Sequence, residues 1–195
     1  MATLKNYLGR ISARDSATML SLAGVWEGAD VCATRVLRAP DLTITAVDKE
    51  TGEDRPYLFR WHLSKRSTQA NDYLHLQVDS DPERPLHDHP WDNMTVILSA
   101  NGYDELVQCE PPYGPVDTVR RRHGEVVFRK AQLAHRLILP PSVPYVLTRF
   151  FTGPKVQPWG FWIGDQWWDY QACTRDIGGG RSVFTYPPGT EPKGV

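Results

Sequence analysis

The spacing of apolar residues changes near residue 41. Before it, apolar side chains recur every three or four residues, which predicts one or two amphipathic helices within residues 3–28. The members of this pattern are Leu4, Tyr7, Leu8, Ile11, Met19, Leu20, Ala23 and Trp26. After it, Leu42, Ile44 and Ala46 alternate with polar residues, which is the period of a half-buried β-strand. The chain therefore changes from helix to strand at about this point.

Short strand-like segments continue to the end of the chain, separated by clusters of Gly, Pro, Asp and Asn that favour turns. They are residues 57–61, 73–78, 94–98, 103–107, 116–122, 125–128, 136–139, 145–151, 159–163 and 183–186. Many short strands at regular spacing indicate a sandwich or a barrel. We expect one mainly β domain, with a helical extension over 1–40, a β-barrel over 41–177 and a loosely held C-terminal arm over 178–195.

Composition narrows the class of protein. The chain is 41% hydrophobic and 23% charged, which is typical of a globular domain. Its formal net charge of −1 makes nucleic acid an unlikely partner, and a small-molecule substrate is the expected one. The three cysteines, Cys32, Cys109 and Cys173, are widely spaced and predict no disulfide framework. Without a signal-like N-terminus or a membrane-spanning apolar run, a cytoplasmic protein is expected.

The segment His87-Asp88-His89 carries the clearest chemical signal. Two histidines at i and i+2 point to the same side of an extended chain, so both imidazoles can bind one ion. His135 and Glu105 are the candidates for a third ligand. Such a set suits Fe(II), Mn, Ni or Zn and leaves positions open for a substrate. The alternative is a pair of histidines at a turn with no metal.

These motifs resemble those of the cupin superfamily. Its first motif contains His-x-His, matched by His87 and His89, and its second contains a single histidine, matched by His135. This resemblance covers about residues 57–163. More narrowly, the segments HDHPW (87–91), NGYDE (101–105) and WGFW (159–162) are similar to those of bacterial and phage cupin-like proteins. The resemblance implies a double-stranded β-helix, or jelly-roll barrel, with a metal site in its interior.

One departure from the cupin pattern concerns the motif glutamate. At its place stand Asn93, Met94 and Thr95, none of which is an anionic ligand. Either Glu105 supplies the carboxylate, or the three histidines hold the ion alone. The second arrangement, which we prefer, is similar to that of the thiol dioxygenases, and it implies a mononuclear Fe(II) oxygenase. A 2-oxoglutarate enzyme is not expected, because the His-x-Asp signature is absent.

Several other residues are candidates for the pocket. Tyr73 and His75 share one face of a strand, which lines either a polar cavity or a solvent surface. Arg149 lies on an otherwise apolar strand, where it either grips an anionic substrate or forms a salt bridge. Tyr103 could act as an acid or a hydrogen-bond donor. Asp88 and Asp92 either orient an imidazole or cap a turn, and the alternative is a pair of solvated turn carboxylates.

Three functions fit these observations. The first is an iron-dependent oxygenase acting on a small polar substrate, with Tyr103 and Glu105 as candidate catalytic residues. The second is an isomerase or lyase that uses the same metal as a Lewis acid. The third is a non-catalytic module that binds a small ligand. A homodimer formed through edge strands is the expected oligomer.

Overall fold

The computed structural model describes residues 3–27, 34–47, 51–178 and 181–192. The fold is mainly β, as predicted, with two short helices at the N-terminal end. The helices and strands are α1 (Lys5–Leu8), α2 (Ala13–Ala23), β1 (Gly24–Glu27), β2 (Thr34–Leu37), β3 (Leu42–Val47), β4 (Asp54–His62), β5 (Asn71–Gln77), β6 (Asn93–Ile97), β7 (Tyr103–Gln108), β8 (Asp117–Arg121), β9 (Val126–Arg129), β10 (Ala134–Ile138), β11 (Val146–Thr152), β12 (Gly160–Ile163), β13 (Gln166–Asp169), η2 (Tyr170–Cys173), β14 (Thr174–Gly178) and β15 (Arg181–Phe184). No helix among the described residues has the length and apolar character needed to cross a membrane.

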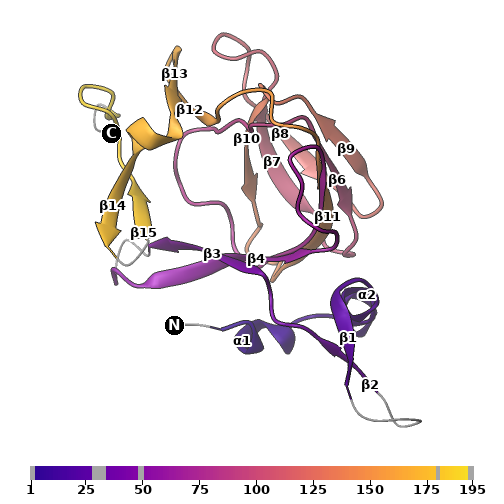
Figure 1. Cartoon of the computed structure of the whole chain (residues 1–195). Coiled ribbons are helices and arrows are strands. Elements are labelled where there is room, and N and C mark those ends of the chain that lie inside the picture. The colour runs from indigo at the N-terminus through magenta and orange to yellow at the C-terminus, as the bar shows by residue number, and fades with distance from the viewer. Residues whose placement is uncertain (1–2, 28–33, 48–50, 179–180, 193–195) are drawn as a thin grey trace.

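Two antiparallel sheets form the barrel (Figure 1). The larger sheet has the order β3-β4-β5-β11-β6-β9, and the smaller has the order β10-β7-β8. Single bridges from His87 to His135 and from His87 to Phe161 join the smaller sheet to the β12–β13 hairpin. Non-consecutive neighbours such as β5 and β11 show that the chain crosses between sheets, as in a jelly roll.

Helix α2 covers the outer face of the larger sheet, where Figure 1 shows the N-terminal elements outside the barrel. Met19 and Ala23 contribute to a buried cluster with Phe59, Trp61, Leu74 and Leu76. The Ser12 side chain caps the helix by accepting a hydrogen bond from the Asp15 backbone N–H. The helix ends at Ala23, earlier than the spacing predicted, because the backbone becomes extended at Gly24 and begins β1.

Strand β5 divides apolar and polar side chains between its two faces. Leu74 and Leu76 face the α2 side and are fully buried. His75 and Gln77 therefore face the barrel interior, and both line its cavity. Of the two faces that the alternation left open, the structure places His75 and Gln77 on a cavity.

The C-terminal residues form more regular structure than an arm. β14 pairs with β15, which places part of 178–195 in a hairpin. Phe184 packs edge-on against Phe161 of β12, with ring centroids 4.9 Å apart. Cys109 and Cys173 are free thiols, whereas Cys32 lies outside the described residues.

Candidate metal centre

A backbone bridge places His87 beside His135. The His87 N–H donates to the His135 carbonyl at 3.1 Å, and the His135 N–H donates back to His87 at 2.9 Å. This reciprocal pair is the hydrogen-bonded pair of an antiparallel ladder, formed by residues 48 positions apart. Neighbouring side chains of such a pair lie on the same face. The bridge thus explains how the second histidine motif meets the first.

Successive side chains of the extended segment 87–89 point in opposite directions. His87 and His89 face the cavity, and Asp88 faces the β12–β13 hairpin. Asp88 accepts hydrogen bonds from the Gly160 N–H at 2.7 Å, the Trp167 Nε1–H at 2.8 Å and the Gln157 Nε2–H at 3.2 Å. Asp88 therefore anchors the histidine segment to the hairpin, and none of its hydrogen bonds among the described residues goes to an imidazole. Of the two roles considered from the sequence, the orienting one is not found.

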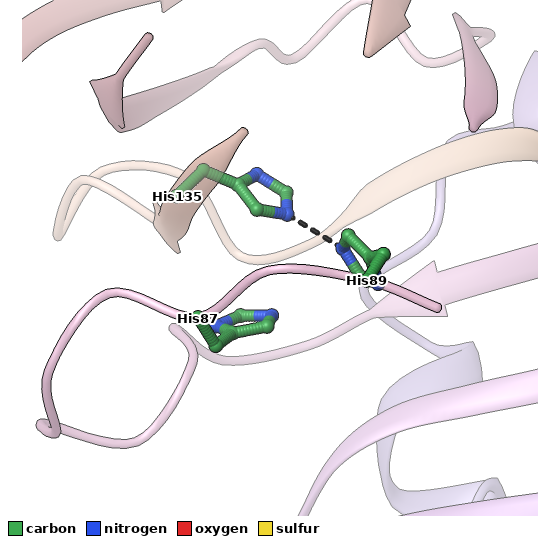
Figure 2. Close-up of side chains that lie close together, drawn as sticks. All are labelled: His87, His89 and His135. Atoms are coloured by element: carbon green, nitrogen blue, oxygen red, sulfur yellow. Dashed lines mark hydrogen bonds between the residues drawn. The ribbon is translucent and has the colours of Figure 1, made fainter. Parts of the chain in front are cut away.

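The three imidazoles converge on one region (Figure 2). One ligating atom from each of His87, His89 and His135 lies within 4.8 Å of the others. The Nε2 atoms of His89 and His135 are only 2.8 Å apart. Two nitrogens bound to one ion at right angles, each at about 2.1 Å, would lie about 3.0 Å apart. The spacing of this pair therefore fits a shared ion.

Burial keeps the histidine cluster available as neutral ligands. Burial, reinforced by the neighbouring imidazole of His135, holds the pKa of His87 and of His89 well below its usual value. Neutral imidazole is the form that binds metal. The His87 Nδ1 atom is buried and has no hydrogen-bond partner, which is uncommon for a buried polar atom. These features fit a metal ion with imidazole ligands.

Glu105 supports the cluster from behind. Its Oε1 lies 2.5 Å from His135 Nδ1, so an ionised Glu105 accepts the Nδ1–H and leaves Nε2 free for an ion. Arg129 donates to both carboxylate oxygens at 2.7 and 3.0 Å, and Arg121 donates to Oε2 at 2.6 Å. Although burial acts to raise the pKa of Glu105, His135 and Arg129 together hold it far below its usual range. Glu105 is absent from the group of converging ligand atoms.

The histidines form one wall of a cavity of about 150 Å³. His75 and Tyr103 also line it, and Trp91 stacks on His89 with ring centroids 5.5 Å apart. The Tyr103 hydroxyl accepts a hydrogen bond from Arg129 Nη2 at 3.2 Å. Tyr73 is not among the lining residues and instead stacks against His75 from behind, with ring centroids 5.9 Å apart.

Arg149 lies away from this cavity. Thr148 and Phe150 of β11 line it, so Arg149 between them points to the opposite face. There it forms a two-pronged ion pair with Asp72, at 3.0 and 2.6 Å. The structural salt bridge, rather than the anion grip, is the arrangement found.

Sequence reasoning missed the arginines of the site. Arg129 is 4% exposed, yet in the sequence it follows three consecutive apolar residues, 126–128, which gave no sign of a buried charge. Arg121 belongs to the run of three arginines at 120–122, and its guanidinium reaches Glu105. The available signal was an interior-facing glutamate, since a buried carboxylate requires a cationic or hydrogen-bonding partner.

The chain is similar to several proteins of known structure. No family model matches the chain, and no curated protein sequence does. The hydroxypropylphosphonic acid epoxidase from S. wedmorenis has 9% identity and a TM-score of 0.41, covering 67% of this chain and 63% of its own. A cupin superfamily protein from Desulfitobacterium hafniense has 11% identity and a TM-score of 0.36, covering 50% and 78%. A conserved protein of unknown function from Streptococcus pyogenes has 17% identity and a TM-score of 0.38, covering 51% and 76%. The match to the epoxidase thus spans less than two thirds of that enzyme.

Proposed function

We propose that this protein binds one divalent cation through His87, His89 and His135 and is a mononuclear metalloenzyme acting on a small polar substrate. The observation that carries the proposal is the convergence of three imidazole ligand atoms within 4.8 Å on the wall of a cavity. Fe(II) is the ion we propose, in an oxygenase. When bound, such an ion supplies Lewis acidity and redox chemistry with dioxygen.

The three histidines are suited to hold the ion rather than to act as acids or bases. Burial, together with the His135 imidazole, lowers the pKa of His87 and His89, which keeps their lone pairs available near neutral pH. Glu105 accepts the His135 Nδ1–H and so selects the tautomer with a free Nε2. Without an anionic ligand, the ion would keep its full charge toward the cavity.

The remaining residues of the cavity would bind and orient the substrate. Trp91 and Phe150 supply aromatic walls beside the histidines. The Tyr103 hydroxyl accepts its hydrogen bond from Arg129 and can donate its own proton to a substrate. Burial raises the pKa of Tyr103, so it stays protonated and remains a donor.

The experiment is elemental analysis of protein purified without a metal-affinity tag. Wild type is compared with the His87→Ala/His89→Ala double variant and with His123→Ala as a matched control, because His123 is exposed and its ring hydrogen-bonds to exposed Arg14. We expect close to one iron per wild-type and control chain and none in the double variant. No metal in wild type, even after anaerobic addition of Fe(II), Mn(II), Ni(II) or Zn(II), would overturn the proposal and favour a metal-free binding module.

Oxygen consumption then tests the oxygenase assignment. Iron-loaded wild type is screened with small chelating substrates, thiols included, in an oxygen electrode. We expect substrate-dependent uptake that the double variant lacks. Stoichiometric zinc or nickel with no oxygen uptake would overturn the oxygenase assignment and favour an isomerase or lyase with the same ligands.

A further inference from the structure

Two arginines on the cavity wall have no carboxylate partner. Arg60 of β4 and Arg84, in the loop before the histidine segment, both line the cavity. Neither forms an ion pair with any residue that the structure describes. The contrast with other arginines is clear, since Arg129 binds Glu105 and Arg149 binds Asp72. A desolvated guanidinium without a counter-charge is unfavourable, so a ligand that supplies the charge would be stabilised there.

Neutral aromatic groups surround Arg60. Its Nε donates to His75 Nε2 at 2.8 Å, and its guanidinium lies 4.8 Å from the centre of the Tyr73 ring. Burial, followed by the charge of Arg60, lowers the pKa of His75 well below its usual value, so this acceptor is uncharged. The contacts hold the guanidinium in place and leave its positive charge uncompensated.

Arg84 is fixed in a similar way. Its guanidinium lies 5.2 Å from the centre of the Phe161 ring, and its Nε is buried without a hydrogen-bond partner. Buried donors in folded proteins are nearly always satisfied. The Arg84 Nε–H lies beside the cavity, so a ligand bound there could accept its hydrogen bond.

The other charges around the cavity offset these two only in part, because Asp81 supplies one negative charge against the two positive charges of the arginines. Asp81 is the one carboxylate among the lining residues described, and its oxygens accept from Gln77 Nε2 at 3.2 Å and from the Leu137 N–H at 2.8 Å. Arg129 also lines the cavity, but Glu105 compensates it. A divalent ion on three neutral histidines would add two further positive charges. The cavity therefore favours an anion.

We propose that the cavity binds a small organic carboxylate, with its carboxylate held by Arg60 and Arg84 and its remainder directed toward the three histidines. This inference rests on the proposed function, because it names the substrate class for the same metal centre. The planar guanidinium matches a carboxylate in geometry and charge. A cavity of about 150 Å³ admits one molecule of about the size of benzene, which limits the substrate to a small acid.

The test compares acids with their neutral amides. Acetate, lactate and benzoate are titrated against acetamide, lactamide and benzamide by calorimetry and thermal shift, with inorganic phosphate as a further anion. We expect at least one acid to bind ten times more tightly than its amide. Arg60→Gln and Arg84→Gln should each remove that preference, whereas Arg149→Gln, whose arginine pairs with Asp72 outside the cavity, should keep it.

Three results would overturn the inference: acids and amides that bind equally, a preference that survives both glutamine variants, or binding of phosphate alone. Far-UV circular dichroism checks that the variants are folded. If a glutamine variant does not fold, Arg60→Lys and Arg84→Lys replace it, since lysine keeps the charge but loses the planar fork and should weaken the preference.

Metal-loaded and chelator-treated protein are tested in parallel to separate the two proposals. A carboxylate preference in protein that binds no metal would overturn the proposed function and leave this inference standing. Stoichiometric metal at the histidines without a carboxylate preference would overturn this inference alone. Because a carboxylate can bind a metal directly, the preference must also be present in the chelator-treated sample.

Discussion

Glu105 accepts a hydrogen bond from His135 Nδ1 across 2.5 Å, and this contact connects a buried ion-pair network to the histidine cluster. The carboxylate is itself fixed by Arg129 and Arg121. A carboxylate behind a metal-binding histidine sets the ring tautomer and raises its basicity. Glu105 is therefore positioned to control the centre through His135 without being a ligand.

Glu105→Gln should weaken metal binding about 10–100-fold, the usual effect of losing such a partner. The amide no longer provides a charged acceptor for the Nδ1–H of His135. Affinity is measured by competition with a coloured chelator. Asp104→Asn is the matched control, because Asp104 neighbours Glu105 on β7 but pairs with the exposed Arg120. Equal affinities for the Gln variant and wild type would contradict the positioning role.

Arg129→Met should destabilise the fold by about 3–5 kcal/mol, because it leaves the buried charge of Glu105 without its main partner. Urea denaturation followed by circular dichroism gives the free energy of unfolding. Arg120→Met removes a half-exposed ion pair and should cost no more than about 1 kcal/mol. Similar losses in the two variants would show that burial of the Arg129 pair does not matter to stability.

The stability of the protein should fall as the pH drops below about 4. The pKa of Glu105 is lower in the folded state than in the unfolded chain, where a glutamate titrates near about 4.3. Its contribution is thus complete above the unfolded value and is lost as protons bind at lower pH. The difference in unfolding free energy between wild type and Glu105→Gln should therefore shrink as the pH is lowered from about 6 to about 3. Parallel curves would exclude Glu105 as the group responsible.

Asp88→Asn should destabilise the fold by about 1–3 kcal/mol, because the amide replaces one acceptor oxygen with a donor and leaves a buried N–H unsatisfied. It should also lower metal affinity, since Asp88 fixes the segment that carries His87 and His89. Urea unfolding and chelator competition measure the two effects. Asp165→Asn, at the exposed turn of the same hairpin, should change neither. Loss of stability with unchanged affinity would separate the anchor from the metal centre.

Local patterns predicted most of the barrel. Alternation located strands such as β5 and β11 to within two residues, because successive side chains of a strand point to opposite faces of the sheet. The i, i+2 spacing of His87 and His89 predicted a shared direction for the same reason. β1, β2, β13 and β14 were not predicted: they are short hairpin strands whose pairing partners, rather than their own pattern, define them.

The sequence by itself determined the mainly β fold, the division of β5 into apolar and polar faces, and the histidines that converge. Those features depend on backbone periodicity and residue type. Only the tertiary structure decided that Glu105 supports His135, that Arg149 pairs outside the cavity, and that Arg60 and Arg84 face it without a counter-charge. These pairings depend on which charged side chains the folded sheets bring within a few ångströms of one another. Neither the periodicity nor the spacing of residues along the chain predicts those contacts.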